Sequence, residues 1–205
     1  MNCGADMERI TIGGRIVRRS SHGIEAWKIQ SLYLRRRAEQ VIMDILLDHH
    51  LLIFEREEML DEQVIRCRDA KMFETRYLRK GFNDKISVIR ILDSRRENFR
   101  LSRAYQHKID VVNVITAPEI EMLIIFNEDK YKEFKKSGKK PSDFCKQNLK
   151  MKDVKSYQFV AEYFSEPVIL TNAIRTYTKI SNVRKDEYTL LDLLKRDHNQ
   201  ISDMR

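Results

Sequence analysis

The sequence predicts an α/β protein with a central, mostly parallel sheet flanked by helices, and with a helical C-terminal third. Two segments rich in Ile, Val and Leu, 86–92 and 109–115, are the first observation, because strands covered on both faces have nearly continuous apolar sequences. The second is the segment between them, 99–106, which has the length of one short helix. Together these segments predict a β-α-β unit, whose two strands are parallel.

The composition fits one soluble domain. The chain has 205 residues, of which 42% are hydrophobic, and this is enough for a single core. The first residues lack an apolar signal segment and no run of about 18 apolar residues follows, so we expect a cytoplasmic protein that does not enter a membrane. No repeat or flexible linker divides the chain, so we expect one domain, 1–205, with a helical part at about 141–196 packed on the sheet.

Cysteine content and charge narrow the functional classes. Three cysteines without C-x-x-C spacing, Cys3, Cys67 and Cys145, argue against a disulfide framework and a zinc site, and they favour a reducing compartment. The formal net charge of +8 favours a polyanionic partner. Nucleic acid is the first candidate and an acidic membrane surface is the second.

The first half of the chain is expected to begin with a short strand at 10–17 and a long helix at about 24–48. Apolar residues recur at helical spacing in 24–48, which leaves the arginine triplet at 35–37 mostly on the other faces. A brief apolar run at 51–54 is expected to form a strand that ends at Glu55.

A shorter helix should follow this strand. Asp69 is a plausible N-cap for it, and Gly81 stands where a glycine would end it.

The rest of the chain after the second strand is expected to be helical. Thr116 and Glu119 have the spacing of a capping box, with Pro118 in the first turn, so a helix should begin there. Glu121, near its start, is either an exposed helix carboxylate or part of a site. Further helices are expected at 141–149, 154–164 and 168–177, and a last one from Thr189, with Asp192 at capping-box spacing.

The densest chemistry directly follows the first strand of the β-α-β unit. Asp93 comes after this strand and Glu97 follows shortly, with four arginines around them: Arg95, Arg96, Arg100 and Arg103. Ligands of open parallel sheets collect at the carboxyl ends of the strands. Carboxylates within a cationic rim therefore predict a divalent metal ion and a phosphate group at this edge.

No common nucleotide, hydrolase or zinc motif is present in the sequence. What remains is a set of carboxylates at expected strand ends or helix starts: Glu25, Glu55, Asp93, Glu97 and Glu121. A Mg²⁺ ion (or Mn²⁺) needs only one or two of them, because it keeps several waters and takes other ligands from substrate phosphate. Surface charge is the competing explanation for each carboxylate.

Three segments carry motifs of a known family: ILDSRRENF, ITAPEIEMLIIF and SHGIEAWKIQSLYL. They resemble motifs of the RloB-like branch of the Toprim (topoisomerase-primase) fold, which comprises small proteins associated with restriction and phage-defence loci. In the first segment, Asp93 matches the first residue of an Asp-x-Asp metal motif. In the second, Pro118 and Glu121 match the proline and glutamate of an Asn-Pro-x-Phe-Glu block. The third resembles a Glu-Gly-x-x-Glu strand-to-helix turn and puts Glu25 near the catalytic glutamate.

The sequence departs from the family pattern at positions that concern catalysis. The second Asp of Asp-x-Asp is Arg95 here, and the Glu-Gly pair is His22-Gly23. The histidine that ends the family's second block is absent after Ile125. Either Glu97 replaces the missing Asp, or the metal site is degenerate.

The resemblance covers most of the chain and implies a Toprim/Rossmann-like fold with a Mg²⁺-dependent nuclease or other phosphoryl-transfer activity on DNA or RNA. It also implies a role in phage defence or abortive infection, with an ATPase as a candidate partner. Asp93 and Glu121 would hold the metal, Glu97 would complete its shell, and Glu25 or Glu55 would be the general base. Phosphate would bind to Arg95, Arg96 and Arg100. The rival hypothesis is a non-catalytic adaptor or nucleic-acid-binding subunit that has lost the metal site.

Overall fold

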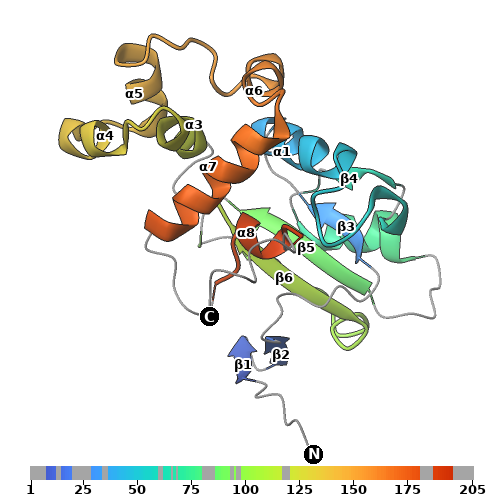
Figure 1. Cartoon of the computed structure of the whole chain (residues 1–205). Coiled ribbons are helices and arrows are strands. Elements are labelled where there is room, and N and C mark those ends of the chain that lie inside the picture. Colours follow the sequence, from blue (N-terminus) through green and yellow to red (C-terminus); the bar gives the residue numbers. More distant parts are fainter. Residues whose placement is uncertain are drawn as a thin grey trace, which may run out of the picture.

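Four parallel strands form the central sheet of the protein, in the order β4-β3-β5-β6 (Figure 1). They are β3 (Ile29–Tyr33), β4 (Val64–Ile65), β5 (Ile86–Leu92) and β6 (Ile109–Ile115). This computed structural model describes residues 8–12, 15–19, 29–33, 37–59, 62–65, 67, 69–79, 86–92, 95, 98–116, 121–180 and 187–195. The sheet confirms the predicted α/β class and the mostly parallel strands.

Strands β5 and β6 pair in parallel over their full length, from Ile86 opposite Ile109 to Leu92 opposite Ile115. This pairing confirms the prediction made from their apolar sequences. The expectation that both strands lie in the sheet interior holds only for β5. Among the described residues, a single bridge between Val114 and Tyr188 continues the sheet beyond β6, and Asp110 and Asn113 of this strand are exposed.

The connection from β5 to β6 is not the helix expected at 99–106. Turns occupy 103–108, and 98–102 has no regular structure. The backbone N–H of Ser102 donates a hydrogen bond to the Glu74 carboxylate, and the Gln106 side chain donates to the carbonyl of Leu101. These side-chain bonds satisfy backbone groups that a helix would have paired internally, so the segment stays irregular.

The N-terminal region differs most from expectation. Strands β1 (Glu8–Ile12) and β2 (Arg15–Arg19) form a separate antiparallel pair where one strand was expected at 10–17. The helix expected at 24–48 begins only at α1 (Arg37–Asp48), because 29–33 is strand β3. The backbone of β3 pairs with β4 and β5, and this tertiary pairing outweighs the helical spacing of the apolar residues of the segment.

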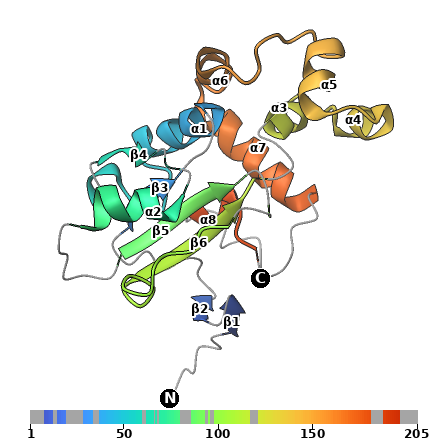
Figure 2. The ribbon, with the colours of Figure 1, turned by 180° about the vertical axis from the view of Figure 1, so that it is seen from behind.

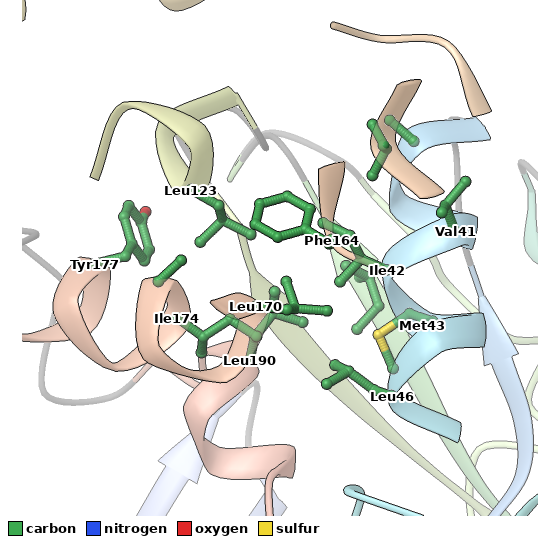
Figure 3. Close-up of a cluster of buried hydrophobic side chains, with 14 of the residues drawn as sticks. Val41, Ile42, Met43, Leu46, Leu123, Phe164, Leu170, Ile174, Tyr177 and Leu190 are labelled. Atoms are coloured by element: carbon green, nitrogen blue, oxygen red, sulfur yellow. The ribbon is translucent and has the colours of Figure 1, made fainter. Parts of the chain in front are cut away.

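One face of the sheet is covered by α1, α7 (Pro167–Ile180) and α8 (Leu190–Leu193), while α6 (Tyr157–Tyr163) packs on α1 and α3 (Glu121–Asn127) packs on α7. Their side chains form one buried cluster with Ile89, Ile91 and Val114 of the sheet. Figure 3 shows Met43 and Leu46 of α1 close to Leu170 of α7 in this cluster. The helical C-terminal part therefore shares the core of the sheet.

The opposite face of the sheet is covered by a shorter helical segment. Helix α2 (Ala70–Phe73) continues directly into a π-helical turn, η3 (Glu74–Leu78), and its side chains pack with Val88 and Ile109. Asp69 is the N-cap of α2, as predicted, because its side chain accepts a hydrogen bond from the backbone N–H of Met72. Gly81, the expected end of this helix, lies outside the described residues.

The strand expected at 51–54 is absent from the described structure. Leu52 makes only one antiparallel bridge, with Leu194, and the 3-10 helix η1 (Arg56–Glu58) follows. Leu52 and Phe54 are buried in the core beside α1, so their apolar character reflects packing and not sheet pairing.

The expected C-terminal helices are confirmed. Helices α4 (Tyr131–Ser137) and α5 (Pro141–Gln147) precede α6 and α7, and Gly138 ends α4 in the left-handed conformation. Thr189 and Asp192 form the predicted capping box of α8. The other expected capping box involves Glu119 and Pro118, which are outside the described part of the chain.

Two further observations concern the cysteines and membrane spans. Cys67 and Cys145, the two described cysteines, are both buried. Within the described residues, no helix has the length and apolar content that crossing a membrane requires.

Removing a side chain from the core of α7 should destabilise the protein. Leu170 is fully buried in the core cluster that α7 shares with α1 and the sheet, so we expect Leu170→Ala to lower the free energy of unfolding by about 2–5 kcal/mol, as measured by urea denaturation. Val168 on the same helix is 65% exposed, and Val168→Ala should change the free energy of unfolding by about 0.5 kcal/mol or less. Equal effects of the two substitutions would contradict the described packing of α7.

Candidate functional site at the carboxyl edge of the sheet

The carboxyl ends of β5 and β6 are held together where the chain leaves the sheet. Thr116 donates two hydrogen bonds to the carbonyl of Leu92, from its backbone N–H at 2.8 Å and from its hydroxyl at 3.1 Å. Thr116 therefore extends the strand pairing and joins the two exits from the sheet. In the sequence, Asp93 directly follows Leu92, the last residue of β5. Asp93, Arg96 and Glu97 themselves lie outside the described residues.

Arg95 is paired with a carboxylate that the sequence analysis did not identify. Its guanidinium donates two hydrogen bonds to Glu187, at 2.5 Å from Nε and 2.8 Å from Nη2. This contact raises the pKa of Arg95. Glu187 directly precedes Tyr188, whose carbonyl accepts a hydrogen bond from the backbone N–H of Ile115. The pair therefore ties the exit of β5 to the segment that borders β6.

Glu121 occupies a different setting from the expected metal site. Its side chain is only 1% exposed, and its Oε1 lies 3.0 Å from Nζ of Lys155. The neighbouring thiol of Cys145 has its pKa raised to about 12, first by burial and then by the negative charge of Glu121. The carboxylate thus belongs to the helical layer around α3 and α5, where Lys155 supplies its counter-charge. Glu121 is therefore neither an exposed helix carboxylate nor an open metal ligand.

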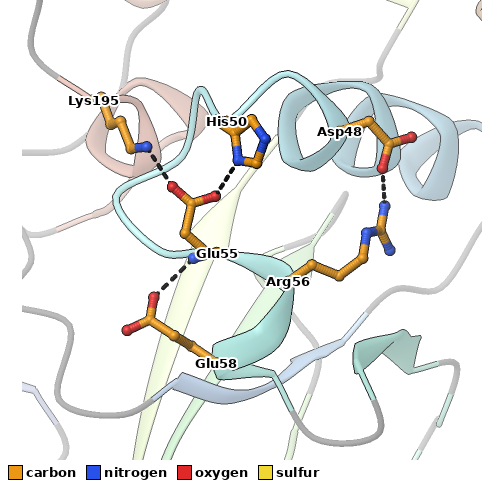
Figure 4. Close-up of polar contacts among 6 residues, drawn as sticks. All are labelled: Asp48, His50, Glu55, Arg56, Glu58 and Lys195. Atoms are coloured by element: carbon orange, nitrogen blue, oxygen red, sulfur yellow. Dashed lines mark hydrogen bonds and ion pairs between the residues drawn. The ribbon is translucent and has the colours of Figure 1, made fainter.

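Glu55 lies at the far end of α1 from the sheet exit. It accepts hydrogen bonds from Nζ of Lys195 at 2.5 Å and from Nδ1 of His50 at 2.8 Å (Figure 4). These contacts lower the pKa of Glu55, with Lys195 as the larger cause. The 12 residues of α1 span about 18 Å, and α1 starts close after β3 leaves the sheet. The structure therefore does not bring Glu55 to the exits of β3 and β5.

The other predicted site residues fall into two groups. Arg100 and Arg103 are exposed on the connection between β5 and β6. Glu25, with Gly23 of the same expected turn, lies outside the described residues. In the chain, Glu25 precedes β3, whereas α1 begins only after β3, at Arg37.

A buried arginine was missed by the sequence analysis. Arg90 of β5 is 1% exposed, and its Nη1 donates a hydrogen bond to Oδ1 of Asn113 on β6. Its guanidinium also lies 4.6 Å from the ring centre of Phe99, a distance at which the cation and the ring attract each other. Arg90 interrupts the apolar sequence of the strand, and this interruption was the available signal.

The described side chains do not form the expected site for a divalent metal ion. They contain no group of three metal-ligating side chains. Glu55 and Glu121 do not fit as open ligands, because a lysine lies beside each carboxylate. Asp93, Glu97 and Glu25 are the remaining candidates, and all three are outside the described part.

Loss of the Lys155 amine should leave the buried Glu121 carboxylate without this counter-charge. We expect Lys155→Ala to lower the free energy of unfolding by about 1–3 kcal/mol, as measured by urea denaturation. Lys152 is exposed in the same loop, so Lys152→Ala is the matched control and should have an effect near zero. A Lys155→Ala variant as stable as this control would contradict the structural function of the pair.

Comparison of the chain with protein-family models, with curated proteins and with solved structures finds no significant match.

Proposed function

We propose that this protein binds nucleic acid at the carboxyl edge of its parallel sheet and catalyses metal-dependent phosphoryl transfer there, as a nuclease of antiviral defence. The observation that carries the proposal is the position of Asp93 in the sequence, directly after β5. Strand β5 is the neighbour of β3 in the middle of the sheet order β4-β3-β5-β6. From this central pair, the chain continues outwards in both directions, to β4 through α1 and to β6 through 98–108. In open α/β sheets of the Rossmann-like kind, ligands bind where the order reverses in this way.

The two connections also cover opposite faces of the sheet, which supports a Rossmann-like or Toprim-like arrangement. Side chains of α1 pack with Ile89 and Ile91, whereas Leu101 and Phe99 pack on the side of Val88. A crevice in such sheets lies between the two connections. The arginines that follow β3 and β5 in the sequence, including Arg95, Arg96 and Arg100, supply planar donors suited to phosphate oxygens.

Asp93 and Glu97 are the proposed metal ligands, and Glu121 is no longer one of them. A bound Mg²⁺ or Mn²⁺ ion would supply neutralisation of phosphate charge and activation of a water. Arg100 is exposed and would bind a phosphate oxygen directly. Glu25 remains the candidate general base of the family resemblance, because Glu55 lies at the other end of α1.

A second function is favoured by the pairing of Arg95. This residue stands at the second acidic position of the family's metal motif, so the site has a cation where a ligand is expected. Its bond to Glu187 gives Arg95 a structural function. A nucleic-acid-binding subunit or adaptor without catalysis, with an ATPase as candidate partner, would keep the fold and this pair.

Metal binding and nuclease activity decide between the two functions. We expect wild-type protein to bind Mg²⁺ or Mn²⁺ in calorimetric titration and to cleave single- or double-stranded DNA or RNA. Asp93→Ala should lose both properties, because it removes the proposed ligand, whereas the control Asp110→Ala, at an exposed position of β6, should retain them.

The alternative outcomes are equally specific. Oligonucleotide binding by wild type without metal binding or cleavage would exclude the nuclease and support the adaptor. No binding to any oligonucleotide at low salt, where electrostatic affinity is highest, would exclude both functions.

A further inference from the structure

The excess positive charge of the protein is concentrated in one short segment. Residues 130–155, here called the lysine arm, contain ten lysines, no arginine and three acidic residues, which gives a net charge of +7. The whole chain has a net charge of +8. The other 179 residues together therefore carry a net charge of only +1, so the overall charge is a property of the arm.

The arm is a folded unit and not a flexible tail. It contains α4 and α5, which are joined at Gly138 and held together by the rings of Phe134 and Phe144, 5.5 Å apart. Tyr131 at its beginning stacks on Phe126 of α3 at 4.8 Å. Because these aromatic side chains are used inside the arm and against α3, its lysines are displayed from a fixed scaffold.

Most of this charge is not compensated locally. Eight of the ten lysines are exposed. Ion pairs join Lys130 to Glu133 and Lys155 to Glu121. For the other eight lysines of the arm, the described residues provide no acidic partner within ion-pair distance. Like charges gathered in this way destabilise a folded surface unless a polyanion binds there.

The arm lies on the same side of the molecule as the carboxyl edge of the sheet. Helix α3 begins six residues after the last residue of β6, and α4 and α5 follow it. Figures 1 and 2 show α4 and α5 at the periphery of the molecule, away from the sheet. The arm therefore extends from the side of the sheet at which β6 ends.

We infer that the lysine arm is the main phosphate-backbone contact of this protein with nucleic acid, and that this contact does not depend on base sequence. The inference rests on the nucleic-acid binding proposed above and names the surface that provides it. Lysine offers a mobile point charge without the planar fork that arginine uses for bases and for paired phosphate oxygens, so the arm would follow the backbone charge.

The surface of the arm favours nucleic acid over a membrane. Helices that lie on anionic membranes display large apolar side chains opposite their basic face. The large exposed hydrophobic residues among the described ones are Met72, Tyr157, Val168 and Ile180, and none of them belongs to the arm. A surface of lysines without exposed apolar groups fits a soluble polyanion.

The test removes three exposed charges from the arm and the same number elsewhere. The arm variant is Lys132→Gln, Lys136→Gln and Lys140→Gln, and the control variant is Lys71→Gln, Arg79→Gln and Lys108→Gln, all at exposed positions. Binding of fluorescently labelled DNA duplexes of two unrelated sequences is measured across a salt series. Wild type is also tested at low salt with a labelled RNA oligonucleotide and with vesicles containing phosphatidylserine. Circular dichroism melting of both variants verifies that they remain folded.

The arm variant should show a log-log salt slope smaller than wild type by about 0.9 for each contacting lysine, or about 2.7 if all three contact phosphate. The control variant should keep the wild-type slope, and both sequences should bind with equal affinity. If wild type binds but the arm and control variants lose affinity equally, the inference is wrong while the proposed function stands. If wild type does not bind DNA or RNA at low salt, or binds only vesicles containing phosphatidylserine, both are wrong.

Discussion

The burial of β5 on both faces is the constraint on which the rest of the structure depends. Ile89 and Ile91 point to one layer of helices, and Val88 packs in the layer on the other side. A strand of this kind cannot stay at a surface, so it requires both the long helices of one face and the short α2–η3 segment of the other. Even the charged residue on this strand, Arg90, is accommodated by Asn113 and Phe99 instead of by solvent.

This arrangement separates two kinds of basic surface. In the sequence, arginines follow the central strands β3 and β5, and one of them, Arg95, bonds to Glu187. Lysines gather in the lysine arm, which is fixed to the core through the contact of Tyr131 with Phe126 of α3 and through the pair of Glu121 with Lys155. In the proposed function, the arm would hold the nucleic-acid backbone while the sheet edge would contact one phosphate. Glu121, which was expected at the metal site, is instead paired with Lys155 of the arm.

Strands β5 and β6, their adjacent parallel positions and the C-terminal helices were predictable from the sequence, because apolar patterns and helix caps are local signals. Asp69, Thr189 and Asp192 illustrate this, since each forms the expected cap. Strand β3 was not predictable in this way, because it depends on pairing with β5, far away in the chain. The carboxylate partners depend likewise on distant residues: Lys195 reaches Glu55 across 140 positions and Glu187 reaches Arg95 across 92. For the candidate site, sequence predicted the exit of β5 correctly but not which carboxylates already have cationic partners.

Photochemical cross-linking to an oligonucleotide tests the central claim most directly. A photoreactive DNA duplex bound to wild-type protein would be irradiated, and the linked peptides would be mapped by mass spectrometry. The account predicts cross-links in the lysine arm at 130–155 and in the connection after β5, near Arg100. Cross-links confined to α2 and η3, on the opposite face of the sheet from α1, would contradict it.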